Sequence, residues 1–318
     1  MTNIALLALT ITLAAEAPAA GSAEAAQTTE TADGAPTARA AAKPPEKDIE
    51  VLSDVVDLQE TEDPAAAWYG TGFPSPVRLL ALPTARTVRA GGWEFIVDHR
   101  SGTPLYDNST GHPYGNMWNT FLGFDSSIRV GLAFRYGLID DLDLGMYRAG
   151  SSQTDTYEFD ARYQILHQST MELDLAVRAG ITWFSQPNAA DASGYFGQLL
   201  ATRLLWNRIL LTGGALYHSN STNDTKYNQD KAWSAALAAG VEVRVAASVG
   251  LDAEVVSCTA GYCSKNPTFS GGVKYITNRH TFALLCGNTA YLTSDGYITN
   301  TDRPWSKLAI GFNITRKH

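Results

Sequence analysis

The chain has 318 residues, of which 45% are hydrophobic, and its formal net charge is −8. This length suffices for one large β-domain with appendages, and an acidic chain without a basic block excludes the charge pattern of a nucleic-acid-binding protein. Beyond the N-terminal segment there is no apolar run of about 18 residues, so the sequence predicts no helical membrane span.

The N-terminal quarter of the chain reads as targeting and linker sequence. Residues 4–15 are largely apolar and lead into an Ala-rich stretch, so we expect a secretory signal peptide over residues 1–23. Residues 24–75 are dominated by Ala, Thr, Pro and Glu, a composition that predicts a disordered periplasmic linker, with one short amphipathic patch at 49–58. The remaining residues, 76–318, are assigned to one β-domain.

Short apolar-patterned segments separated by turn-forming clusters fill the rest of the chain, and they predict twelve β-strands. We expect these strands at 93–100, 127–138, 142–148, 157–166, 171–184, 195–205, 208–218, 232–243, 247–257, 267–277, 280–288 and 305–315.

The connections between these strands alternate between short and long without a break. Tight turns are predicted at 139–141, 168–170, 206–207, 244–246 and 278–279, with longer loops between them. This sorting is typical of an up-and-down antiparallel transmembrane β-barrel in the bacterial outer membrane, with the short turns on the periplasmic side. Such a protein has outer-membrane lipids and the outer-membrane assembly machinery as partners.

Alternate side chains define the two faces of each predicted strand. A charged side chain near the middle of the lipid face costs about 2–4 kcal/mol for Arg or Lys, so the polar face is expected to line the lumen. The predicted lumen-facing charged residues are Arg129, Arg135, Glu158, Asp160, Arg162, Glu172, Asp174, Arg178, Glu242, Asp252, Glu254 and Lys274. Asp143 is assigned instead to a polar hairpin end with Asp140 and Asp141.

Turn positions predict strand registers, and two strands resist a simple reading. The predicted cross-strand pairs are Asp160 with Arg178, Glu242 with Ser248, Ala238 with Asp252, and Lys274 with Ala283. Cys286 is expected to face lipid. Strands 195–205 and 208–218 are apolar on both faces, which leaves Arg203 hard to place. Either a bulge or an inward apolar patch against a plug or ligand would explain them.

Aromatic residues are found near both ends of the predicted strands. This pattern predicts two belts at the membrane–water interfaces. Tyr157, Trp183, Tyr195, Trp233 and Trp305 lie at the long-loop ends, and Trp93, Tyr136, Tyr163, Trp206 and Tyr275 lie near the opposite ends.

Few residues suggest chemistry. His218 and Ser219 resemble the His-x-Ser-Asn element of outer-membrane lipid hydrolases, but adjacent strand residues point to opposite faces, so catalysis is a minor alternative. The loop at 219–231 is rich in Asn and Asp without matching a calcium motif, and a solvated loop is favoured. Cys258 and Cys263 would form a disulfide in an oxidising compartment or remain free thiols. No cofactor motif is found, and no enzymatic activity is predicted.

The run 121–138, which ends Phe-Arg-Tyr-Gly-Leu, and the segments 143–148 and 157–168 resemble a bacterial family of predicted outer-membrane β-barrels with no established activity. Segment 82–95 resembles the opening strand of that family. The resemblance extends over residues 76–318 and implies fold and location only.

Three functions are compatible with this sequence. A narrow channel or porin-like protein for small solutes is favoured, because the predicted lumen is charged and no catalytic set is found. The first alternative is a non-conducting scaffold barrel that binds a periplasmic protein through its N-terminal linker. The second is the lipid hydrolase that would use His218.

Overall fold

The structure is a computed structural model that describes residues 77–106, 128–150, 155–185, 191–221 and 232–318. The predicted signal peptide and linker, and most of the Asn- and Asp-rich loop, lie outside the described residues. No helix among the described residues is both long enough and apolar enough to cross a membrane.

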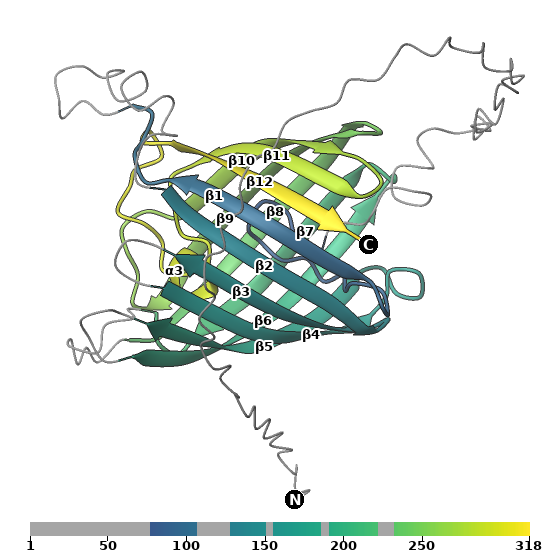
Figure 1. Cartoon of the computed structure of the whole chain (residues 1–318), viewed down its shortest axis with the longest axis horizontal. Helices are drawn as coiled ribbons and strands as arrows, with labels where there is room; N and C mark the ends of the chain where they lie inside the picture. The colour runs from purple at the N-terminus through teal and green to yellow at the C-terminus, as the bar shows by residue number, and fades with distance from the viewer. Residues whose placement is uncertain (1–76, 107–127, 151–154, 186–190, 222–231) are drawn as a thin grey trace, which may run out of the picture. The chain divides into compact units, whose positions relative to one another are not determined.

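Twelve strands form a closed antiparallel barrel in which each strand pairs with its sequence neighbours and the first pairs with the last (Figure 1). The predicted up-and-down barrel is therefore confirmed. The strands are β1 (Trp93–Ser101), β2 (Ile128–Ile139), β3 (Leu142–Gly150), β4 (Asp155–Leu166), β5 (Asp174–Ser185), β6 (Ala192–Leu205), β7 (Ile209–His218), β8 (Ser234–Ala246), β9 (Val249–Gly261), β10 (Thr268–Ile276), β11 (His280–Gly287) and β12 (Ala309–Lys317).

The outer surface of the barrel is apolar because one residue in two along each strand points outward. Large apolar side chains are exposed on this surface, where contact with water would be unfavourable, while the side chains at the alternate positions are buried. Outward side chains include Leu132, Phe134, Met146, Phe159, Ile181, Leu199, Leu237, Leu251, Val273 and Leu284. An apolar exterior of this kind matches hydrocarbon rather than water.

The predicted registers are only partly correct. Lys274 pairs with Ala283 as predicted, and Cys286 lies on the outward face. The other three pairs are wrong: Asp160 pairs with Gly180, Glu242 with Asp252, and Ala238 with Val256. Bulges near both turns, together with a β4–β5 turn longer than predicted, move the strands relative to each other. The inward and outward faces are preserved because each opposing partner moves by an even number of residues.

The β6–β7 turn has the geometry that a tight hairpin requires. The N–H of Arg208 donates to the carbonyl of Leu205 at 3.0 Å, and both central residues, Trp206 and Asn207, have positive φ angles of 51° and 50°. This is the left-handed pair of conformations typical of a type I′ turn, whose twist matches the flanking strands.

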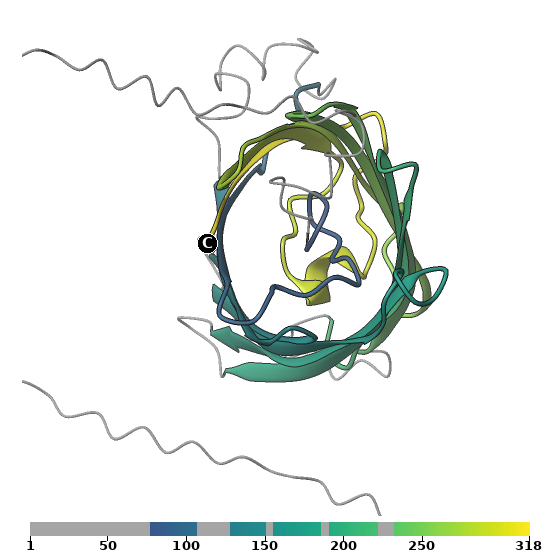
Figure 2. The same ribbon diagram turned by 90° about the vertical axis from the view of Figure 1, so that its right-hand side faces the viewer.

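Two segments that are not part of the wall occupy the lumen (Figure 2). Residues 77–92, called here the plug, precede β1. The β11–β12 connection, residues 288–308, carries the short helix α3 (Ser294–Tyr297) and is called here the inserted loop. A plug was one explanation of the apolar inward faces of β6 and β7, but the sequence did not assign it to a segment. The segment from Leu82 that resembles a family opening strand becomes a strand only at Trp93.

The plug leaves the lumen at the tight-turn end and is held closely against the rim. The N–H of Gly91 donates to the carbonyl of Gly137 at 2.8 Å, and the N–H of Gly137 donates to Gly92 at 3.0 Å. A Cβ atom at Gly137 would lie 1.9 Å from the carbonyl oxygen of Arg89, so only glycine permits this approach.

Leu284 on β11 gives a direct test of the outward face, since its residue surface is 56% exposed. We expect Leu284→Arg to lower the free energy of unfolding in lipid vesicles by about 2–4 kcal/mol, because the cation would lie in hydrocarbon. Val245 at the tight-turn rim is 53% exposed and is the matched control; Val245→Arg should cost about 0–1 kcal/mol. Denaturant titration measures both, and equal losses would contradict this orientation.

Candidate functional site in the barrel lumen

The lumen is the candidate site because it is where polar groups converge. Eight strands enclose a space that side chains can fill, so a barrel of twelve strands has room for more. A chain segment placed in that space brings its own N–H and C=O groups, and each must find a partner.

On one side of the lumen, the wall binds the turn at the tip of the plug. The Glu254 carboxylate of β9 accepts hydrogen bonds from the N–H groups of Ala81 and Leu82, each at 3.0 Å. The side-chain amide of Asn313 on β12 donates to the carbonyl of Leu80 at 2.8 Å. A charged acceptor for two adjacent N–H groups is a strong form of backbone recognition.

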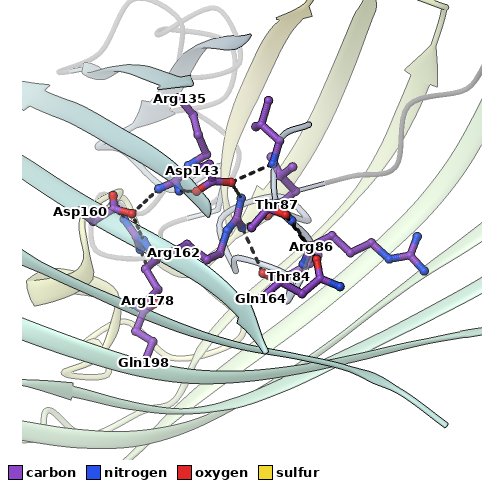
Figure 3. Close-up of polar contacts among 12 residues, drawn as sticks. Thr84, Arg86, Thr87, Arg135, Asp143, Asp160, Arg162, Gln164, Arg178 and Gln198 are labelled. Carbon is purple, nitrogen blue, oxygen red and sulfur yellow. Dashed lines mark hydrogen bonds and ion pairs between the residues drawn. The ribbon is translucent and has the colours of Figure 1, made fainter. Parts of the chain in front are cut away.

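On the opposite side, one arginine clamps the two arms of the plug (Figure 3). Arg162 of β4 donates through Nη1 to the carbonyls of Val77 at 2.8 Å and Thr84 at 3.1 Å. Its Nη2 lies 2.6 Å from Asp143 of β3. The same Asp143 carboxylate accepts from the N–H of Val88 at 2.9 Å. Arg162 and Asp143 are both buried, so this pair is shielded from solvent.

Further wall groups hold the plug as it runs to the rim. Thr202 Oγ1 on β6 accepts from the N–H of Ala85 at 2.9 Å, and Arg86 Nε lies 2.8 Å from the Asp174 carboxylate at the start of β5. The plug is therefore bound by side chains from strands on all sides of the barrel.

Apolar packing accompanies these polar contacts. Leu82 and Ala85 of the plug belong to one buried cluster with Leu200 of β6 and Leu216 of β7. This cluster settles the question left open by the sequence, since the inward apolar patch on these strands packs against a plug. Arg203 is on the outward face, where it pairs with Glu172 at 2.6 Å.

Ion pairs fill the wall between these contacts. Arg178 binds Asp160 through Nε at 2.9 Å and Nη2 at 2.8 Å, and Arg135 bridges Asp160 and Asp143. A second group on the other side joins Glu242 to Arg244 at 2.6 Å and to Lys274 at 2.7 Å, with Asp252 2.8 Å from Lys274. Loss of one partner of a buried pair leaves the other charge uncompensated.

The inserted loop fills the other part of the lumen. The N–H of Ser294 donates to Glu158 of β4 at 2.6 Å, and Gln198 of β6 donates to the Tyr297 hydroxyl at 2.8 Å. Asp295 of α3 is buried without a counter-charge in direct contact. Burial, reinforced by the charge of Glu158, raises the pKa of Asp295 to about 7.

A disulfide lies beside the inserted loop. Cys258 and Cys263, at the end of β9, are bonded to each other. The N–H of Cys258 donates to the side chain of Asn300 at 2.7 Å, and the N–H of Ser264 donates to the carbonyl of Thr299 at 2.7 Å. The disulfide-bonded segment therefore holds the inserted loop through these two hydrogen bonds.

Most of the charged residues predicted to face the lumen point inward. Arg129 lies on the inward face near the long-loop end, with its guanidinium 4.8 Å from the centroid of the Tyr291 ring. Glu172 is an error, because it lies in the β4–β5 turn with its side chain 84% exposed. The remaining predicted residues, whose side chains are buried or nearly so, are Arg135, Glu158, Asp160, Arg162, Asp174, Arg178, Glu242, Asp252, Glu254 and Lys274.

Several lumen residues were missed. Asp143 was assigned to a hairpin end, yet it contacts both Arg162 and the plug; its place opposite Arg162 in the β3–β4 register was the available signal. Others are Glu94, Asp98 and Arg100 of β1, Arg244 of β8 and Asn313 of β12. Alternation along the first strand would have found three of them.

His218 has no arrangement suited to hydrolysis. Its Nδ1 accepts from the N–H of Asn220 at 3.1 Å, and its Nε2 lies 3.0 Å from Thr182 Oγ1. The Ser219 hydroxyl instead accepts from the N–H of Tyr195 at 2.8 Å. The imidazole and the Thr182 hydroxyl beside it are both fully buried, so neither is open to a lipid ester. No group of three or more His, Cys, Asp and Glu in the described part of the chain could hold a metal ion.

Small cavities remain between the plug and the wall. A cavity of about 60 Å³ between the plug and the wall is lined by residues that include Arg78, Glu94, Arg135 and Tyr147, and others measure about 30 and 10 Å³. The cavity of about 60 Å³ has room for a few water molecules. Wall side chains that a water-filled pore would wet are instead covered.

This architecture agrees with the one family found for the sequence. The family described as "Membrane bound beta barrel domain (DUF5777)" matches residues 75–318. The chain belongs to this family of membrane-bound β-barrel domains. The apolar exterior is thus the surface that meets lipid, and the barrel is a protein of the bacterial outer membrane.

Other comparisons add little. Curated protein sequences include no match to this DUF5777 chain. Among solved structures, a KdgM porin has a TM-score of 0.44 and 8% identity, covering 71% of this chain and 98% of its own. A NanC porin has a TM-score of 0.44 and 11% identity, covering 70% of this chain and 97% of its own. Outer membrane phospholipase A from Escherichia coli has a TM-score of 0.40 and 11% identity, covering 70% of this chain and 89% of its own. None of these similarities bears on what this chain does.

The plug clamp can be tested at Arg162. Arg162→Leu removes the donor to two plug carbonyls and one partner of Asp143, so we expect the free energy of unfolding to fall by about 3–5 kcal/mol. Amide hydrogen exchange in residues 77–92 should accelerate in parallel. Arg203→Leu breaks an exposed pair and should cost about 0–1 kcal/mol. Unchanged exchange in the plug of the Arg162 variant would contradict the clamp.

Asp295 predicts a pH dependence of stability. A carboxyl whose pKa is near 7 in the folded state and about 4 when unfolded binds more protons folded, so stability should decline as pH rises from about 4 to about 7. For one titrating group, the free energy of unfolding changes by about 1.4 kcal/mol per pH unit over this range. Asp295→Asn should flatten this part of the profile. The readout is the difference between wild-type and variant unfolding free energies at each pH, and parallel profiles would contradict it.

Proposed function

We propose that the protein is an outer-membrane channel for small polar solutes that is closed, in the state described, by its own plug. The observation that supports this most directly is that the plug is held by reversible polar contacts against a charged wall. Glu254, Arg162 and Thr202 bind its backbone without any covalent link. Displacement of the plug would leave a polar surface, which water and small ions wet readily.

The chemistry of the wall favours a channel over a permanently filled barrel. Buried ion pairs give little net stability, and apolar side chains of similar volume often serve as well or better in a permanent core. The groups around Asp160 and Glu242 are nevertheless ionic. Such a wall is compatible with both a packed state and a hydrated one.

The second candidate is a non-conducting scaffold that displays its N-terminal segment to a periplasmic protein. The apolar inward patch favours it, because Leu200 and Leu216 would be exposed to water if the plug left. In this alternative, residues 24–75 bind the partner and the plug fastens them to the membrane. The hydrolase alternative is disfavoured, because His218 and the Thr182 hydroxyl that it contacts are both fully buried.

Planar-bilayer conductance separates the channel from the scaffold. Wild-type protein should carry almost no steady current. Glu254→Ala with Thr202→Val removes the acceptors for the N–H groups of Ala81, Leu82 and Ala85, so plug displacement should become easier by about 2 kcal/mol or more, about thirtyfold in the equilibrium. The double variant should therefore show openings that wild type lacks.

Glu172→Gln is the matched control, since it removes an exposed carboxylate that does not touch the plug. It should behave as wild type. If neither the double variant nor a variant lacking residues 77–91 conducts when folded, the scaffold is favoured. Large steady currents through wild-type protein would show that the plug does not close the barrel.

A further inference from the structure

A cluster of cationic and aromatic side chains lies on the outward face where the barrel closes, and nothing in the lumen explains it. Arg316, near the end of β12, is flanked by His280 on β11 and by Phe95 on β1 in the strand register. All three lie on the lipid-facing side of the tight-turn end. Arg279 in the adjoining β10–β11 turn is exposed.

Trp93 on β1 extends this surface by its contacts with Arg316 and His318. The guanidinium of Arg316 lies 5.9 Å from the centroid of the Trp93 ring, and the His318 ring stacks on the same indole at 5.8 Å. The backbone carbonyl of Arg279 accepts a hydrogen bond from the N–H of Lys317 at 2.8 Å, which brings the turn beside the last strand. We call Trp93, Arg279, His280, Arg316 and His318 the seam cluster.

The positive charge of the seam cluster is not balanced by acidic side chains. Along the described strands β10, β11, β12 and β1, the outward positions carry no Asp or Glu. Glu94 points inward, where it pairs with Lys317 at 3.0 Å. A main-chain oxygen of His318 accepts a hydrogen bond from the N–H of Trp93 at 3.1 Å. By contrast, Arg203 at the same end of the barrel is paired with Glu172.

We propose that the seam cluster binds the phosphate of an anionic phospholipid in the periplasmic leaflet. Planar guanidinium groups are well suited to phosphate oxygens because they present paired N–H donors. An indole ring at the headgroup level has its apolar body toward the acyl chains and its polar edge toward water. Phe95 and Phe282, below the cluster on the outward face, provide the apolar surface along which the chains would lie.

The site differs from general contact with the bilayer in position and charge. A lipid bound there would touch β11, β12 and β1 together, and so would hold the last strand against the first. It is independent of the proposed channel, because none of its side chains faces the lumen.

Native mass spectrometry of the full-length protein in detergent tests the proposal, with phosphatidylglycerol as the probe lipid and phosphatidylcholine for comparison. Wild-type protein should retain more phosphatidylglycerol than phosphatidylcholine. Arg279→Gln with Arg316→Gln should lower the bound fraction, with an apparent dissociation constant raised about tenfold or more. Arg316→Lys, which keeps the charge but loses the fork, should give an intermediate value.

Arg203→Gln is the matched control, since it removes an exposed arginine at the same end of the barrel, and its affinity should stay within about twofold of wild type. Retention by the double variant equal to that of the control would overturn the proposal. Complete displacement of the lipid by millimolar inorganic phosphate would also overturn it, because the site would then recognise free phosphate. If the double variant does not fold, Arg279→Gln alone, in a turn, should still weaken binding.

Discussion

The structure depends on one constraint: a polypeptide inside a membrane barrel must have its backbone polar groups satisfied by the barrel itself. The wall strands meet this requirement through their ladder, but the plug has only a short hairpin of its own, in which the N–H of Leu79 donates to the carbonyl of Leu82 and the N–H of Thr84 donates to that of Val77. Several of its other N–H and C=O groups are satisfied by wall side chains, with Glu254, Asn313, Arg162 and Thr202 at separate points of the circumference. The charged inner face of the wall is therefore a binding surface for one particular segment, and the position of the plug follows from it.

Ionic groups suit this task because each can serve two partners at once. Arg162 binds plug carbonyls with one Nη atom and Asp143 with the other, while Asp143 also accepts from the plug backbone. Removal of either one would disturb wall and plug together. Buried pairs of this kind contribute more to defining a single arrangement than to net stability. The apolar contacts of Leu82 and Ala85 then supply the part of the binding that does not depend on geometry.

The directions of the wall side chains could be predicted from the sequence, but the strand registers and the position of the plug could not. Alternation fixes which way Lys274 and Leu284 point, because a two-residue period has only two settings. It does not fix register, and Asp160 and Glu242 were each paired two to four residues away from their observed partners, since bulges near the turns leave no clear pattern. The plug was beyond reach for a different reason. Residues 77–92 have neither the helical nor the strand period, and apart from the short hairpin between Val77 and Thr84 their conformation is defined by contacts with distant strands.

The plug and the wall meet at the closing seam, where β1 pairs with β12. The plug joins the wall at Trp93, whose N–H bonds to the last residue and whose ring faces lipid beside Arg316. Any movement of the plug must therefore end at this residue unless β1 itself is pulled from β12. An aromatic side chain at the membrane interface resists displacement in either direction, because one end prefers hydrocarbon and the other prefers water. If the plug moves, as proposed for the channel, the seam is the fixed point at which that movement ends.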